Sequence, residues 1–241
     1  MEFVITDVPT WVAVLFIISF VTPIYLIAQV AKKAYLRANK SDVEAQRVSR
    51  NIYFFYAVFL GMIALLSLMG VFAANTLPPR ILLIGALPLL LFYFLYIRSS
   101  AWFKIILENA PLSDLVKIHL FRFVGIFFFI NYYYGTLPKQ FAFTGGGGDI
   151  LTALLAIWVI YVLKQKKKYA ISLTWIWNVI GLLDILSVLV TAVLITREAV
   201  VTGVEGVAQF GTFPFSWIPA FAPATILFLH IVIFGKLQGR R

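Results

Sequence analysis

Seven apolar stretches separated by short polar segments make up most of this 241-residue chain. A helix needs roughly 20 apolar residues to cross the hydrocarbon core of a bilayer, and the stretches are close to that length. The pattern therefore predicts an all-α, polytopic membrane protein in which residues 1–241 form one seven-helix transmembrane domain. We expect the spans at about residues 9–30, 52–73, 81–97, 116–134, 149–163, 171–196 and 217–234.

Two segments depart from a plain alternation of spans and loops. Residues 99–115 mix aromatic side chains such as Trp102 with charged ones such as Lys104 and Glu108, which is typical of an interfacial segment. The fifth span is short, and the loop before it contains four consecutive glycines, residues 145–148. We expect these glycines to give the loop room to fold back, so that its apolar part dips into the membrane.

The basic residues lie in short runs between the apolar stretches, and their distribution predicts the orientation. If the N-terminus is outside, sixteen of the 20 Lys and Arg residues face the cytoplasm, three face outside and Arg122 lies within a span. Cytoplasmic loops carry the excess of basic residues in membrane proteins. We therefore expect an outside N-terminus and a cytoplasmic C-terminus.

Composition supports the bilayer as the solvent. The chain is 62% hydrophobic and 12% charged, whereas soluble domains have about 45–50% apolar and about 25% charged residues. The absence of cysteine excludes disulfides, thiolate metal sites and iron–sulfur clusters. The net charge of +10 is spread over short loops, so no basic face for nucleic acid is expected.

A few polar side chains fall inside the predicted spans. A charge near the centre of a membrane costs roughly 2.5–3.5 kcal/mol, so such groups are usually paired or face a cavity. We expect them to form a small polar pocket among the fourth to seventh spans. Its predicted ligand-binding residues are Arg122, Asn178, Asp184 and His230, with His119 and Asp149 at its edges.

Most of these residues also have a simpler structural interpretation. Arg122 and His119 would be interfacial anchors, because arginine can extend its charged end to the membrane surface. Asp149 would cap the helix that begins after the glycines. Asn178 and His230 would form hydrogen bonds between helices. These interpretations stay open beside the pocket.

Motif searches do not indicate an enzyme. No Gly-Lys-Ser/Thr follows the glycines, and no HExxH or GxSxG motif is present. A retinal Schiff base needs a lysine in the middle of the seventh helix, whereas Lys236 lies at its cytoplasmic end, which argues against a retinal protein. His119 and His230 are the two histidines that a b-type haem would use, but their predicted depths in the membrane differ by several ångströms.

The second half of the chain carries Arg-x-x-Gly, Leu-Pro, Phe-Ala, Gly-x-Gly-Asp, Trp-Asn-x-x-Gly-Leu-x-Asp and a Pro-rich last helix ending in Leu-His. This pattern resembles an uncharacterised family of bacterial seven-span hypothetical membrane proteins. The matching residues are Arg122, Gly125, Leu137, Pro138, Phe141, Ala142, Gly146, Gly148, Asp149, Trp177, Asn178, Gly181, Leu182, Asp184, Pro219, Pro223 and His230. The resemblance implies a bacterial inner membrane and implies no activity.

The leading functional hypothesis is that the polar pocket binds or translocates a small solute. Asp184 and the histidines would exchange protons, and Arg122 would attract an anionic group. The alternative is a heptahelical sensor or binding module for an apolar ligand, lined by aromatic residues such as Phe127–Phe129 and Tyr132–Tyr134. An intramembrane enzyme with Asp184 or His230 as general base ranks last. The expected partners are the lipid bilayer and a small-molecule ligand, and the oligomeric state stays open.

Overall fold

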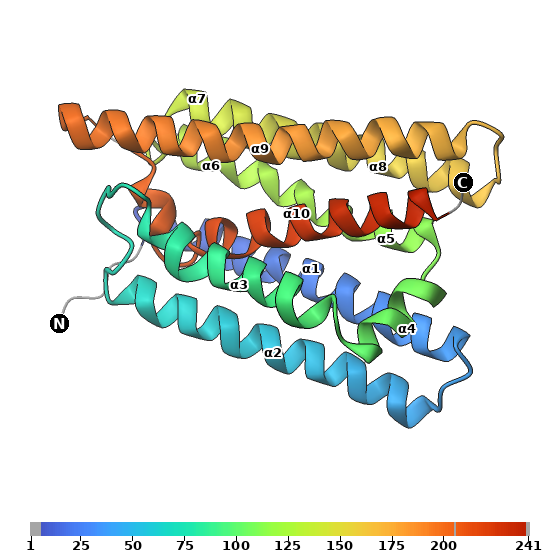
Figure 1. Ribbon diagram of the computed structural model, residues 1–241. Coiled ribbons are helices and arrows are strands. Elements are labelled where there is room, and N and C mark those ends of the chain that lie inside the picture. Colours follow the sequence, from blue (N-terminus) through green and yellow to red (C-terminus); the bar gives the residue numbers. More distant parts are fainter. Residues whose placement is uncertain (1–5, 205, 240–241) are drawn as a thin grey trace.

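The computed structural model describes residues 6–204 and 206–239, and every regular element in that part is a helix. Long helices run side by side in one bundle (Figure 1), and 81% of the structure is helical. Residues 1–5, 205 and 240–241 of the expected single domain lie outside the described residues. The elements are α1 (Thr10–Arg37), α2 (Asp42–Leu68), η1 (Leu82–Ala86), α3 (Leu87–Phe92), η2 (Tyr93–Ile97), α4 (Ala101–Asn109), α5 (Leu112–Ile118), η3 (His119–Gly125), α6 (Ile126–Tyr133), α7 (Lys139–Phe141), η4 (Ala142–Gly147), α8 (Gly148–Lys164), α9 (Ala170–Thr202), η5 (Ala208–Gly211) and α10 (Trp217–Gln238).

Five helices of the described part are long and apolar enough to cross a membrane: α1, α2, the continuous segment Lys139–Lys164, α9 and α10. A sixth is obtained if Leu82–Ile97 and α4 are counted as one bent span. The chain is thus all-helical, as expected, and compatible with a multi-pass membrane protein. Residues 112–133 form α5, η3 and α6 in direct succession and run from one end of the bundle toward the other (Figure 1).

The longest polar stretch of the sequence, residues 32–50, is mostly helical rather than a loop. α1 continues to Arg37 and α2 begins at Asp42, so only four residues connect them. The start of α2 is fixed by a capping box. Glu44 N donates to Ser41 Oγ at 3.2 Å, and Ser41 N donates to Glu44 Oε2 at 3.0 Å. These reciprocal bonds satisfy backbone donors at the helix start, which explains why the helix extends ten residues beyond the predicted span.

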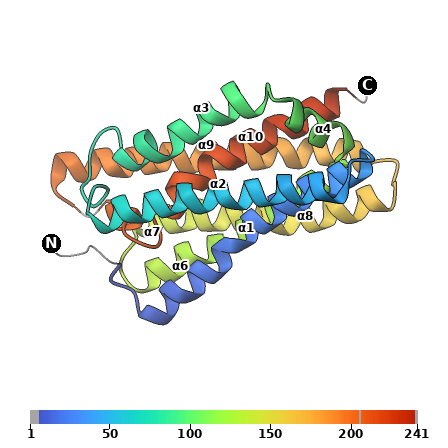
Figure 2. The same cartoon turned by 90° about the horizontal axis from the view of Figure 1, so that it is seen from below.

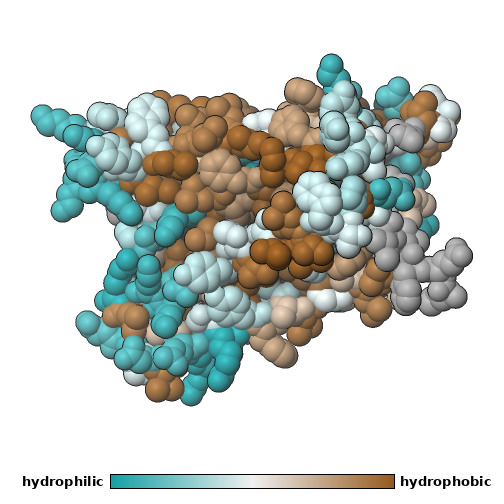
Figure 3. Space-filling view, turned by 180° about the vertical axis from the view of Figure 1, so that it is seen from behind, coloured by the Kyte–Doolittle hydropathy of each residue, from teal (hydrophilic) through white to brown (hydrophobic). Residues whose placement is uncertain are grey.

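α10 is the most enclosed of the long helices. In its most apolar window 72% of the residues are buried, against 28–39% for the other four long helices. It packs against α9, η1, α3, α5 and α2, and Figure 2 shows the other helices arranged around it. The outer faces of these helices carry many exposed apolar side chains. Figure 3 shows them as a broad apolar region, with hydrophilic residues gathered toward one end.

The segment predicted to be interfacial contains α4, whose axis is bent by 87° from the preceding residues Leu82–Ile97. Ser100 caps it, since its Oγ accepts a hydrogen bond from Phe103 N at 3.4 Å. The bend carries α4 across the end of the bundle, so that its aromatic residues cover the space between the longer helices. Its position in the membrane interface stays a prediction.

Candidate functional site

Arg122 of η3 is the centre of a buried polar cluster. Its side chain is fully buried, yet each guanidinium nitrogen meets a polar group. Nε donates to Asp149 Oδ1 at 2.6 Å, and Nη2 donates to Asp184 Oδ2. Nη1 donates to the carbonyl oxygen of Gly181 at 3.2 Å and lies 3.4 Å from His230 Nε2. The interpretation of Arg122 as a side chain that reaches toward the membrane surface is therefore wrong.

Asn178 and His230 join α9 to α10 beside the arginine. His230 Nδ1 lies 2.7 Å from Asn178 Oδ1, and Asn178 Nδ2 donates to the backbone carbonyl oxygen of His230 at 3.0 Å. Both residues are completely buried. This reciprocal pair fixes the ring of His230 with its Nε2 toward Arg122. The two residues therefore form a hydrogen bond between helices and also belong to the Arg122 cluster.

His119 lies on the other side of His230. The ring centroids of the two histidines are 4.3 Å apart, and Trp177 packs edge-on against His119 at 5.1 Å. Although His119 is completely buried, neither of its ring nitrogens has a hydrogen-bond partner among the described residues. The two rings, brought together by η3 and α10, can therefore differ in depth by no more than this 4.3 Å separation of their centroids.

All six predicted site residues thus lie in one cluster built by η3, α8, α9 and α10. The side chains are packed together rather than arranged around a void. Cavities of about 360, 590 and 50 Å³ in the described part of the chain are lined by other residues. Asp149 is not at the edge but in direct contact with Arg122.

The four glycines lie inside a helix, so the expected loop and the expected cap at Asp149 are both wrong. Ala142–Gly147 form a π-helical turn that continues directly into α8. A Cβ atom on Gly146 would lie 2.7 Å from the carbonyl oxygen of Gly125, and one on Gly125 would lie 2.8 Å from Asp149 Cβ. Real Cβ atoms do not approach that closely. The glycines therefore let the two helices pack backbone to backbone, which brings Asp149 within reach of Arg122.

Gly148, the last of the four consecutive glycines, and Gly181 of α9 make room for the cluster itself. A Cβ atom on Gly148 would overlap the carboxylate of Asp184, and one on Gly181 would lie 2.6 Å from Cε1 of His230. Trp177 closes the cluster from α9, with its indole N–H donating to the carbonyl oxygen of Thr152 at 3.0 Å. Sequence reasoning did not identify Thr152 or these steric roles, although glycines next to polar residues in apolar helices are a signal for close packing.

The geometry limits which cofactors fit. The rings of His119 and His230 are in contact, which leaves no space for a porphyrin between them. No group of three or more His, Cys, Asp or Glu residues able to hold a metal ion occurs in the part of the chain that the structure describes. What the cluster offers instead is two carboxylates, one guanidinium and two imidazoles packed against one another.

Comparison with family models matches residues 77–238 to a family described as Domain of unknown function (DUF8737). No curated protein and no solved structure matches the chain. The matched region contains all six residues of the Arg122 cluster and excludes α1 and α2.

Proposed function

The chain belongs to the DUF8737 family, whose description gives no activity, and we propose from its geometry that it is a seven-span membrane protein that binds a small solute and couples its movement to that of a proton. The spans are α1, α2, Leu82–Ile97, residues 112–133, Lys139–Lys164, α9 and α10. The N-terminus is outside and the C-terminus cytoplasmic. The basic connections α1–α2 and α8–α9 support this orientation, since both lie at the end of the bundle where α10 finishes (Figure 1).

The observation that carries the proposal is the charge imbalance around Arg122. One guanidinium faces two carboxylates, Asp149 and Asp184. With neutral histidines the cluster has a net charge of minus one, and an unbalanced charge is costly in a membrane-embedded site. One additional proton makes the cluster neutral. A purely structural ion pair would need only one carboxylate, so the second one is the group that we assign to proton exchange.

Asp184 is the carboxylate better placed for this role, because the residue is only partly buried, whereas Asp149 is a buried residue. The side chains of both aspartates are 11% exposed, whereas that of Arg122 is fully buried, so protons reach the carboxylates more readily than the guanidinium. His119 adds a buried imidazole with unpaired nitrogens next to His230. Imidazole can accept a proton in the physiological pH range.

The same contacts bear on the class of solute. Every nitrogen of Arg122 already meets a protein group. An anionic solute would have to displace Asp184, whereas a small cation would replace the extra proton at the two carboxylates. We therefore propose exchange between a proton and a small cation, with the anion as the competing class.

The test begins with the proton itself. Infrared difference spectra of the purified protein between acidic and neutral pH should contain the carbonyl band of a protonated carboxyl group, and Asp184→Asn should remove it. Asp114→Asn is the matched control, because Asp114 pairs with Arg37 at 2.8 Å on the surface. If the band is present in wild type and in Asp184→Asn alike, Asp184 is not the proton site.

Transport is then measured in proteoliposomes that contain a pH-sensitive dye. A panel of small cations and anions is added outside, and the expected result is a solute-dependent change of internal pH that Asp184→Asn abolishes and Asp114→Asn does not. Solute flux without a change of internal pH would show that the transport is not coupled to a proton. If no solute of either class produces a flux, or if Asp184→Asn and Arg122→Gln leave the flux unchanged, the proposed function is wrong.

A further inference from the structure

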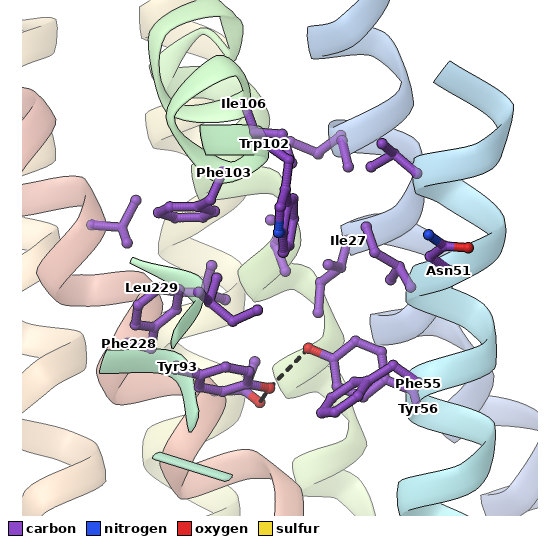
Figure 4. Close-up of a pocket in the computed structure, with 18 of the residues that line it drawn as sticks. Ile27, Asn51, Phe55, Tyr56, Tyr93, Trp102, Phe103, Ile106, Phe228 and Leu229 are labelled. Carbon is purple, nitrogen blue, oxygen red and sulfur yellow. Dashed lines mark hydrogen bonds between the residues drawn. The ribbon is translucent and has the colours of Figure 1, made fainter. Parts of the chain in front are cut away.

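A second feature, separate from the Arg122 cluster, is a partly open cavity of about 360 Å³ lined by residues of α1, α2, η2, α4, α5 and α10 (Figure 4). Its volume falls within the range of about 300–1,000 Å³ that is usual for small-molecule sites. α4 closes one end of it: Figure 4 shows Trp102, Phe103 and Ile106 above the space and Tyr56 and Tyr93 below it. None of the six cluster residues lines this cavity.

The walls are almost entirely apolar and largely aromatic. Phe55, Trp102, Phe103 and Phe228 face the space from three different elements (Figure 4). Aromatic walls favour an apolar occupant with a flat, aromatic or polyunsaturated body, because rings stack at small offset with a gain beyond simple burial. Water is a poor occupant of such a space, since a buried water needs two to four polar partners.

One wall carries a chain of three buried hydroxyl groups. The hydroxyl groups of Tyr56 and Tyr93 are 2.8 Å apart, and that of Tyr93 lies 3.0 Å from Thr225 Oγ1. These residues are 5%, 4% and 2% exposed. Three hydroxyl groups carry three protons, but two hydrogen bonds use only two of them. One O–H therefore has no acceptor among the described residues, and it belongs to Tyr56, Tyr93 or Thr225 according to the direction in which the two bonds run.

A buried donor without an acceptor is costly, and such groups in native proteins usually have a partner. An acceptor oxygen on an occupant of the cavity would supply it. Arg47 and Asn51, which also line the cavity, lie on the α2 wall about 13.5 and about 7.5 Å along the helix from Tyr56. An apolar stretch of the wall thus separates the three hydroxyl groups from the charged side chain of Arg47. This arrangement suits an elongated molecule.

We propose that this cavity binds an apolar carbonyl compound. Its aromatic or polyunsaturated body lies between the aromatic walls, and its carbonyl oxygen accepts the free proton of the Tyr56–Tyr93–Thr225 chain. The site lies outside the Arg122 cluster, so it stands or falls independently of solute transport.

The test compares two probes that share a body and differ in the carbonyl oxygens: menadione, a naphthoquinone, and 2-methylnaphthalene. Menadione binding to the purified full-length protein is followed by quenching of tryptophan fluorescence, and 2-methylnaphthalene is titrated as the competitor. The chain contains no cysteine with which a quinone would react. One hydrogen bond to an otherwise unpaired donor should make menadione roughly tenfold tighter than 2-methylnaphthalene.

The variant must remove all three hydroxyl groups, because a chain of one or two still has one free proton. Tyr56→Phe/Tyr93→Phe/Thr225→Val keeps the shapes and should bind both probes equally. Tyr96→Phe is the matched control: it removes a tyrosine hydroxyl from the same lining but outside the chain, and should keep the preference for menadione.

Two results would overturn the proposal in wild type alone, even if the triple variant did not fold. Equal affinity for the two probes would mean an unspecific apolar cavity of the kind that a lipid chain fills. No binding of menadione would mean that the cavity does not accept this class. A triple variant that folds and keeps the preference for menadione would also refute the role of the hydroxyl groups.

Discussion

The charge imbalance predicts that removing the positive charge and removing one negative charge have very different effects on stability. Arg122→Gln removes the counter-charge that Asp149 and Asp184 share, and the side chain of each aspartate is only 11% exposed. Breaking a buried ion pair by removing one partner costs about 3–5 kcal/mol, because the remaining charge is uncompensated. Two charges remain here, so we expect a loss of about 5 kcal/mol in the free energy of unfolding.

Asp184→Asn should cost far less. The amide oxygen can still accept the hydrogen bond from Arg122 Nη2, and Arg122 keeps its ion pair with Asp149 at 2.6 Å. The remaining pair is electrically neutral. The change therefore replaces a charge-assisted hydrogen bond by an ordinary one, which is a difference of about 1 kcal/mol. A combined variant, Arg122→Gln with Asp149→Asn and Asp184→Asn, should recover much of the stability lost in Arg122→Gln.

The assay is equilibrium unfolding in mixed micelles, with tryptophan fluorescence as the signal, and Asp114→Asn serves as the surface control. Buried Trp177 packs against both histidines and reports on the cluster. The reasoning would be refuted if Asp184→Asn were as destabilising as Arg122→Gln. Both carboxylates would then be fixed counter-charges, and the cluster would hold no exchangeable proton.

Two further predictions concern the surroundings of the cluster. Gly148→Ala should destabilise the protein by about 1–3 kcal/mol in the same unfolding assay, because its Cβ would overlap the Asp184 carboxylate. Gly147→Ala should be neutral or stabilising, because the nearest neighbour of its Cβ would be Phe129 at 4.0 Å. Equal effects of the two substitutions would contradict the steric argument. His119→Leu should leave the free energy of unfolding unchanged or raise it by about 1 kcal/mol, since it removes two unpaired buried nitrogens. The same substitution should slow proton movement in proteoliposomes. A large loss of stability would mean that the ring has a structural partner.

The convergence of the polar residues was predictable because lipid restricts where ionisable groups can lie. Arg122 and Asp184 are too few and too deep to be ordinary surface charges, and the structure places them in contact. What could not be predicted is that the members of the cluster pack directly against one another. That property depends on Gly146, Gly148 and Gly181, whose contacts are with residues far away in the sequence.

The apolar cavity shows the opposite case. Its predicted lining residues, Phe127–Phe129, lie elsewhere: Phe127 packs against Phe16, and Phe128 packs against Phe141 and Phe210. The actual cavity is lined by α1, α2, η2, α4, α5 and α10, none of which was predicted to line a site for an apolar ligand. A run of aromatic residues indicates apolar surroundings but not a void. The void depends on the 87° bend before α4, which is a property of the packed bundle.

The cavity and the cluster share two walls, and this leads to a last prediction. Ile118 and Leu229 line the cavity, and the next residue in each case, His119 or His230, belongs to the cluster. Because a packed wall transmits displacement, an occupant that shifts α10 also shifts His230 against Arg122. Coupling of this kind is reciprocal.

The affinity of menadione should therefore depend on pH in wild type and become independent of pH in Asp184→Asn, in which the proposed proton site is absent. Fluorescence titrations at pH 5.5 and 7.5 measure the affinity for menadione in wild type and in Asp184→Asn. The control is Asp114→Asn, which removes a carboxylate paired with Arg37 and leaves the Arg122 cluster intact. A coupling of 1–3 kcal/mol, which is typical of linked sites, corresponds to roughly a 5- to 150-fold difference in affinity. Affinities that do not change with pH in wild type would show that α10 separates the two sites without linking them.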